Sequence, residues 1–267
     1  MKRRGISYYL QWLVTLLTAA FMVVPALQSI AAGVTVDYFH GLASGVTLKW
    51  LIEVWGLYQS SIWLSLWLAF ACLIVTLVIG VPAAYALVRW KGWGARIIEE
   101  FVSLPLAVPG LAIALALLQL YGGFREFRNS WLFILTGHVV YTLPFMIRSV
   151  MAVLSIIDLK GMEEAAGTLG AGAWRRFFDI AVPNAVPGIL AGALTVVTLS
   201  IGEFNLTWML HTPYMKTLPV GLADSYASMR LEIASAYTLI FFLMIVPLLS
   251  LLQWVTARAN RYAKAVR

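Results

Sequence analysis

Six stretches of this chain, each 19 residues or longer, contain no Asp, Glu, Lys or Arg. They are Gly5–Val36, Val54–Val88, Phe101–Phe124, Asn129–Ile147, Ile180–Gly202 and Ile233–Ala257. A helix needs about 20 mostly apolar residues to cross a membrane, and a charge at its centre costs about 2.5–3.5 kcal/mol. The pattern therefore predicts an all-α, polytopic membrane protein with six transmembrane helices.

The composition excludes a soluble globular protein. Hydrophobic residues make up 61% of the 267 residues and charged residues 12%, against roughly 45–50% and about 25% in soluble domains. The apolar run from Tyr8 to Ile30 is longer than the roughly 7–15 residues of a signal-peptide core, so we expect an uncleaved first helix. Cys72 is the only cysteine, and His40, His138 and His211 are isolated in the sequence, so no metal site is predicted.

The basic residues orient the predicted helices. If the N-terminus is cytoplasmic, 14 Lys and Arg fall inside and five outside, and an excess of basic residues marks the cytoplasmic side. We therefore expect both termini in the cytoplasm, contact with membrane lipid, and no role for the net charge of +7 in binding nucleic acid. The predicted organisation is an N-terminal helix with an external loop (1–58), a five-helix core (59–258) and a basic cytoplasmic tail (259–267).

The third predicted span contains the densest helix-breaking sequence in the chain, with Pro105 and Pro109 four residues apart. Proline lacks the backbone N–H that an interior helical position donates. We expect this helix to be kinked or broken there. Both a break that only improves packing and one that shapes a solute path remain open.

The cytoplasmic loop 158–183 is the most informative segment. Asp158 suits the N-cap of a short helix, and Gly170 suits its left-handed stop. A second short helix is expected to place Trp174, Phe177 and Phe178 on one face. Such helices often lie on lipid headgroups. Here, however, the small residues 165–167 and 170–172 allow close approach of another protein and offer little to lipid.

This loop resembles a family motif. Glu164-Ala165-Ala166, then Gly170, then Ile180, Val182 and Pro183 match the EAA loop in permease subunits of bacterial binding-protein-dependent type I ABC importers. The one departure is Val182, where the family pattern has Leu. The resemblance extends from about Ser60 to Arg258 and is greatest for the polyamine, sulfate and molybdate group. It implies a type I ABC importer (MetI-like) core in the bacterial inner membrane.

In that family the loop is the coupling helix, which docks on the cytoplasmic ATPase. The resemblance implies that the docking residues are Glu164, Ala165, Ala166, Gly170, Trp174 and Arg175. No G-x-x-x-x-G-K-[ST] loop occurs in this chain, so ATP and Mg²⁺ would be bound by the partner ATPase. We therefore predict a transport subunit without an enzymatic activity or cofactor of its own.

The resemblance also implies the remaining partners. These are two copies of the ATPase, a second permease subunit in a hetero-pair rather than a homodimer, and an external solute-binding protein. The binding protein would meet the outside stretches Gly33–Gln59 and His211–Ala234.

Polar residues after the fifth span are candidates for the solute pathway. Glu203 would lie near the outer membrane boundary, and an acid at that depth is a candidate for a gating role or for a structural ion pair. Asn205 and Thr207 follow it. With Gln119 and Thr142 they would line a polar route, or tie helices together.

The solute is the least determined feature. A polyamine or a phosphonate-like metabolite is preferred on whole-chain resemblance, with sulfate, molybdate or ferric ion as alternatives. An ion-coupled secondary carrier and a membrane scaffold without transport activity are the competing functions. A secondary carrier usually shows repeated halves and intramembrane charges, and neither is evident in this sequence.

Overall fold

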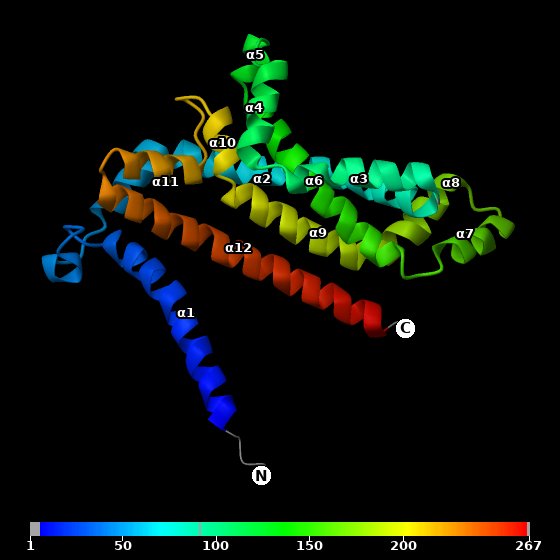
Figure 1. The fold of residues 1–267 in the computed structure, drawn as a ribbon, viewed down its shortest axis with the longest axis horizontal. Helices are drawn as coiled ribbons and strands as arrows, with labels where there is room; N and C mark the ends of the chain where they lie inside the picture. Colours follow the sequence, from blue (N-terminus) through cyan, green and yellow to red (C-terminus); the bar gives the residue numbers. More distant parts are fainter. Residues whose placement is uncertain (1–5, 91, 266–267) are drawn as a thin grey trace. The chain divides into compact units, whose positions relative to one another are not determined.

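The computed structural model describes residues 6–90 and 92–265, with their side chains except at positions 6, 255 and 259–265. Figure 1 shows that this part of the chain is built from helices. They are α1 (Ile6–Ala32), η1 (Gly41–Ser44), α2 (Lys49–Arg89), α3 (Trp93–Ala107), α4 (Gly110–Tyr121), α5 (Arg125–Arg128), α6 (Trp131–Leu154), α7 (Leu159–Thr168), α8 (Ala173–Arg175), η2 (Arg176–Ala181), α9 (Val182–Gly202), α10 (Asn205–Leu210), α11 (Leu218–Ala227) and α12 (Leu231–Ala265). The side chains of the predicted basic tail, 259–267, lie outside the described residues.

Within the described chain, five helical runs are long and apolar enough to span a membrane. They are Ser7–Ala32, Lys49–Arg89, Trp131–Leu154, Ala173–Gly202 and Leu231–Arg258. The bent pair α3 and α4 supplies a sixth when it is taken as one span. The prediction of an all-α polytopic protein with six spans is confirmed in this form.

The third span is broken, as its prolines predict. Helices α3 and α4 meet at an angle of 106°, and α4 turns away from the line of α3 in Figure 1. Val108 has the extended dihedrals φ −95° and ψ 129°, because the ring of the following Pro109 clashes with a helical conformation at the preceding residue. Pro105 lies inside α3 without ending it.

Helices α6 and α9 form the main packed pair of the core, and they run side by side in Figure 1. Two glycines four residues apart on α9 allow this approach. A Cβ atom at Gly188 would lie 2.5 Å from the Ser149 carbonyl oxygen, and one at Gly192 would lie 2.8 Å from the Met146 sulfur. Small residues at this spacing let helix backbones pack closely where lipid gives no hydrophobic drive to associate.

The chain divides into two compact units. Unit 1 contains Met1–Gln59 and Gly221–Met244, and unit 2 contains Ser60–Val220 and Ile245–Arg267. Both the predicted docking loop and the predicted pathway residues belong to unit 2.

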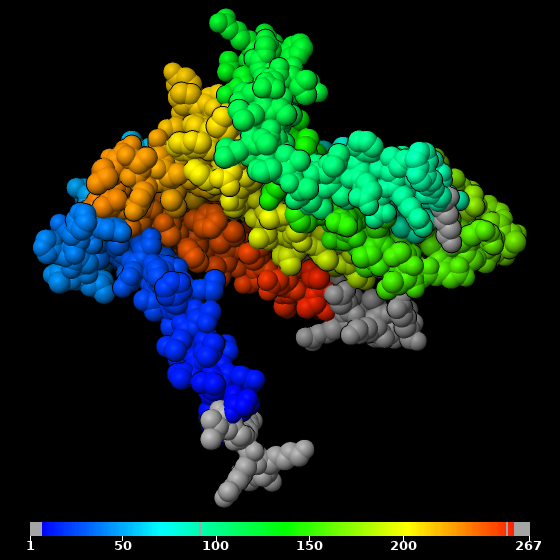
Figure 2. Space-filling view, in the orientation of Figure 1, coloured from blue at the N-terminus to red at the C-terminus, as the bar shows by residue number. Residues whose placement is uncertain are grey.

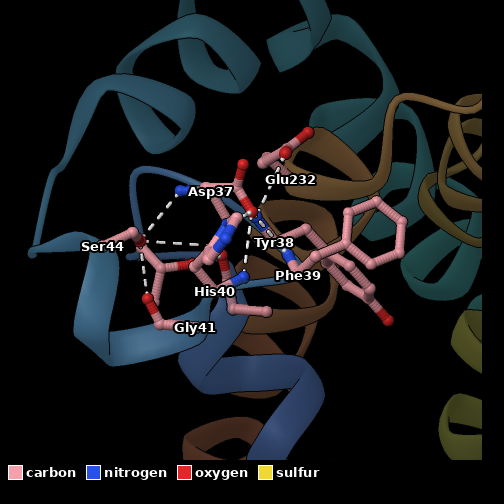
Figure 3. Close-up of polar contacts among 9 residues, drawn as sticks. Asp37, Tyr38, Phe39, His40, Gly41, Ser44 and Glu232 are labelled. Atoms are coloured by element: carbon pink, nitrogen blue, oxygen red, sulfur yellow. Dashed lines mark hydrogen bonds and ion pairs between the residues drawn. The ribbon is translucent and has the colours of Figure 1, made fainter.

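Unit 1 joins two stretches predicted to lie outside. Asp37 accepts hydrogen bonds from the backbone N–H groups of Phe39 (2.8 Å) and His40 (2.9 Å), forming the tight turn in Figure 3. These bonds hold the pKa of the Asp37 carboxyl below its ordinary value, and the bond from the His40 backbone N–H has the largest effect. The neighbouring backbone N–H of Tyr38 donates to Glu232 at 3.2 Å, which ties this loop to the start of α12.

Candidate functional site

Helix α7 begins and ends where the sequence predicts. The Asp158 carboxylate accepts a hydrogen bond from the backbone N–H of Gly161 at 3.1 Å, which satisfies a group that the first helical turn leaves unpaired. Beyond Thr168 the chain turns at Gly170, whose φ of 83° lies in the left-handed region that glycine adopts without strain. Leu159 is buried and anchors the inner face of the first turn.

The residues predicted to dock a partner lie on the surface of this loop, at one end of unit 2 (Figure 2). All are exposed except the half-buried Ala166: Glu164, Ala165, Ala166, Gly170, Trp174 and Arg175. Glu164 keeps 67% of its side chain exposed and has Lys160 as an ion-pair partner at 3.5 Å. Exposed pairs of this kind are worth about 0–1 kcal/mol, so the Glu164 carboxylate can exchange Lys160 for another cation.

Two large apolar side chains flank the small residues of the turn. Leu169 is 89% exposed and Trp174 is 77% exposed. The ring of Trp174 stacks on Phe178 at a centroid distance of 6.0 Å. The exposed surface therefore combines a flat region of small side chains with two apolar projections, which suits contact with a protein.

The prediction of a separate second helix in this loop is wrong. Helix α8 continues without a break through η2 into α9, as one run over Ala173–Gly202. The connecting segment η2 is π-helical, and its wider turns place Pro183 where no i→i−4 hydrogen bond is required. The three aromatic residues do pack together as predicted, since Phe178 stacks on Trp174 and meets the Phe177 ring edge-on at a centroid distance of 4.9 Å. Phe177 also turns inward against Tyr85, with centroids 5.1 Å apart.

Glu163, which lies next to the exposed Glu164, is a residue that the sequence does not single out. Only 4% of its side chain is exposed. Its carboxylate accepts a hydrogen bond from the Tyr85 hydroxyl at 2.5 Å and pairs with Arg89 Nε at 3.0 Å. The helical rotation of about 100° per residue separates the two acids, so one faces α2 and the other faces away from the molecule.

A cavity of about 650 Å³ lies beside this buried acid. Its walls come from the C-terminal ends of α2 and α6 and from the start of α7. They are lined by Val88, Arg89, Trp90, Met151, Leu154, Ser155, Ile157, Asp158, Leu159, Lys160 and Glu163. Helix α7 is therefore not packed tightly against α2 and α6 along its whole inner face.

The predicted pathway residues lie at the break between α9 and α10. Glu203 directly follows the last residue of α9. Its carboxylate accepts hydrogen bonds from the backbone N–H groups of Leu206 (3.1 Å) and Thr207 (2.9 Å). The Thr207 hydroxyl donates to the same carboxylate at 3.1 Å. The structure thus brings Glu203 and Thr207 together and leaves Asn205 exposed.

His138 extends this network into the core, although it is isolated in the sequence. Its Nε2 lies 2.8 Å from the Thr207 hydroxyl oxygen and its Nδ1 lies 2.8 Å from the Ser200 hydroxyl oxygen. Because Thr207 gives its own hydrogen to Glu203, His138 Nε2–H is the donor to Thr207, and Ser200 donates to Nδ1. Among the described residues, no three His, Cys, Asp or Glu side chains are grouped so as to hold a metal ion.

Arg128 holds the opposite end of α10. Its guanidinium donates to the carbonyl oxygens of Leu210 at 2.8 Å and His211 at 3.4 Å. Burial lowers the pKa of Arg128 below its ordinary value, although a guanidinium stays charged at any physiological pH. An acid at the N-terminus and a base at the C-terminus complement the dipole of this six-residue helix.

The sequence of this chain is similar to those of known membrane transport proteins. Residues 76–261 match the family described as "Binding-protein-dependent transport system inner membrane component". The molybdenum transport system permease protein of Haemophilus influenzae is 32% identical over 76% of this chain and 95% of its own length. The putative 2-aminoethylphosphonate transport system permease protein of Salmonella typhimurium is 28% identical over 68% of this chain and 69% of its own length.

A solved structure supports the fold. A bacterial ABC transporter involved in the import of the acidic polysaccharide alginate matches with a TM-score of 0.74. The match covers 94% of this chain and 95% of that chain, at 13% sequence identity. The loop 158–183 and the break between α9 and α10 both lie inside the region that the family match covers.

Proposed function

The chain belongs to the family of binding-protein-dependent transport system inner membrane components, and we propose that its α7 surface couples a partner ATPase to solute uptake. As a permease subunit of an ABC importer it is a multi-pass inner-membrane protein and a transporter rather than an enzyme. In the proposed complex, two ATPase subunits bind ATP and Mg²⁺. A second, related permease completes the pathway, and an external binding protein delivers the solute.

One observation carries the docking proposal: α7 is a capped helix that exposes a flat surface of small residues with one acid. Ala165 and Gly170 allow a partner backbone to approach closely, while Leu169 and Trp174 supply apolar contact on either side. Glu164 is held only by an exposed pair with Lys160. A basic side chain of the ATPase would therefore meet an available carboxylate.

The proposed mechanism is alternating access. Closure of the ATPase pair would move α7, and the spans would rock between inward-facing and outward-facing arrangements. The broken span at Val108 and the break at Glu203 supply joints in the core at which α4 and α10 change direction. We propose that Glu203, together with Thr207 and the exposed Asn205, belongs to a gate at this second break.

For the solute we propose a small oxyanion of the molybdate type. This assignment is supported by the H. influenzae molybdenum permease, of which this chain covers 95%. A phosphonate is the second candidate, supported by the 2-aminoethylphosphonate relative. A polyamine, which the sequence resemblance preferred together with a phosphonate, and sulfate and ferric ion, which it left as alternatives, are the competing solutes.

Uptake of radiolabelled molybdate by cells expressing the importer tests both the energy source and the solute. We expect uptake to stop when the partner ATPase is disabled and to persist when a protonophore collapses the proton gradient in cells still supplied with ATP. The reverse pattern would support the secondary carrier, and association with partners without any uptake would support the scaffold. An excess of tungstate should compete, whereas competition only by 2-aminoethylphosphonate or spermidine would reassign the solute.

A further inference from the structure

Helix α7 carries two neighbouring acids in opposite environments. The Glu164 side chain is 67% exposed and that of Glu163 is 4% exposed. Taking a carboxylate out of water is unfavourable unless charged or hydrogen-bonding partners compensate for the lost hydration. The contacts of Glu163 therefore indicate what the inner face of α7 is built to hold.

Those contacts form a closed triangle. The Tyr85 hydroxyl donates to one Glu163 oxygen at 2.5 Å, and Arg89 Nε lies 3.0 Å from the other. Arg89 Nη1 donates to the Tyr85 hydroxyl oxygen at 3.1 Å. Each of the three side chains is thus bonded to both of the others. Bonds in which one partner is charged are shorter and roughly twice as strong as neutral ones.

The triangle and one adjoining aromatic ring connect three segments of unit 2. Glu163 belongs to α7, and Tyr85 and Arg89 belong to the last two turns of α2. Phe177 of η2 packs edge-on against the Tyr85 ring, with centroids 5.1 Å apart. Because α7 also packs directly on η2, which continues into α9, a displacement of α7 would reach α2 through the polar bonds and α9 through η2.

The triangle connects α7 to the end of α2 at a place where the packing between these helices is incomplete. A cavity of about 650 Å³ lies between parts of α7 and the ends of α2 and α6. Close-packed side chains would carry a displacement across many small contacts, but a cavity removes such contacts from one side of each lining residue. The Glu163 triangle bridges α7 and α2 at the edge of this space.

We infer that Glu163 is a positioning residue that transmits the movement of α7 to α2 through Tyr85 and Arg89. This inference rests on the proposed function, in which the outer face of α7 docks the ATPase. The two acids then have different roles: Glu164 binds the ATPase, and Glu163 fixes α7 to α2. Neither role requires the other residue to change its own contacts.

The test separates coupling from docking. The complete importer, with Glu163→Gln, is reconstituted in proteoliposomes with ATP inside and loaded binding protein outside. We expect the ATPase to co-purify as in wild type, while the number of solute molecules imported per ATP hydrolysed falls about tenfold, in line with loss of one charge-assisted hydrogen bond. Glu100→Gln, which changes an exposed acid on α3, should leave this ratio unchanged.

Two further variants test the same contacts of Glu163. Tyr85→Phe removes a single hydroxyl and should lower the ratio of imported solute to hydrolysed ATP about threefold, as expected for loss of a weaker bond. This variant gives a result even if Glu163→Gln fails to accumulate. The charge exchange Glu163→Arg with Arg89→Glu should restore part of the ratio lost in Glu163→Arg alone. A purely structural role would lower transport and ATP hydrolysis in proportion and leave the ratio constant.

The outcomes are distinct from those that test docking. An unchanged ratio of solute to ATP in both Glu163→Gln and Tyr85→Phe would overturn the inference while leaving the docking proposal intact. Loss of the ATPase from Glu163→Gln, but not from Glu164→Arg, would also overturn it, because the inner acid would then be the docking residue. Failure of wild type to recover any ATPase would refute the proposed function itself.

Discussion

Replacing Glu203 with Gln should loosen α10 without unfolding the protein. The carboxylate accepts three hydrogen bonds, from the backbone N–H groups of Leu206 and Thr207 and from the Thr207 hydroxyl. An amide keeps one acceptor oxygen and places an NH₂ group at the site of the other. If the oxygen stays with Thr207, the NH₂ group faces the N–H of Leu206, and donor then meets donor.

The magnitude follows from these contacts. One lost hydrogen bond to a charged group corresponds to about 1.5–3 kcal/mol, and the lost charge at a helix N-terminus to about 0.3–1 kcal/mol. Glu203 is only partly buried, so solvent screening reduces the sum to about 1–2 kcal/mol. A free-energy change of that size alters the population of an opened α10 by a factor of about 5–30.

Amide hydrogen exchange measured by mass spectrometry on peptides covering α10 gives the readout. We expect the α10 amides to exchange about 5–30 times faster in Glu203→Gln than in wild type, with α6 unaffected. Glu126→Gln, at an exposed acid of the nearby α5, is the matched control and should not change exchange. Equal protection of α10 in wild type and Glu203→Gln would refute the capping role. Loss of protein accumulation would instead make Glu203 a residue of global stability.

Two other predictions concern the same core. Gly188→Ala places a Cβ atom 2.5 Å from the Ser149 carbonyl oxygen, and we expect a loss of about 1–3 kcal/mol, seen as a lower melting temperature in detergent. Gly202→Ala on the same helix meets nothing within 4 Å; a drop as large as that of Gly188→Ala would contradict the packing account. Arg128→Gln removes the charged donor to the Leu210 carbonyl, so amide hydrogen exchange at the C-terminal end of α10 should become several-fold faster. Unchanged exchange there would show that Arg128 does not stabilise this end of α10.

Local chemistry explains which features the sequence predicts. The break at Pro109, the Asp158 cap and the left-handed Gly170 each depend on a few neighbouring residues. Charge-free length predicts the spans for the same reason, because each apolar run is a property of one contiguous segment of the chain. These predictions are confirmed by the structure.

The features that sequence analysis missed depend on distant partners. His138 is isolated in the sequence, yet it meets Ser200 and Thr207, which lie 62 and 69 residues away. Glu163 is distinguished from Glu164 by its contacts with Tyr85, 78 residues earlier, and with Arg89 at the end of the same helix. Prolines usually lie in the first turn of a helix, so Pro183 predicts the start of a new helix. In the structure, the π-helical turn before Pro183 accommodates this proline inside the continuous run from α8 into α9.

The most direct test of the central claim is a gentle-detergent purification of the tagged chain, analysed by mass spectrometry beside Glu164→Arg. We predict that wild type recovers an ATPase, a second permease and an external binding protein, and that the mutant loses the ATPase while keeping the second permease. The recovered binding protein would also identify the solute. Recovery of the wild-type chain alone, under conditions that preserve other membrane complexes, or equal recovery of the ATPase by wild type and mutant, would contradict the proposed docking through α7.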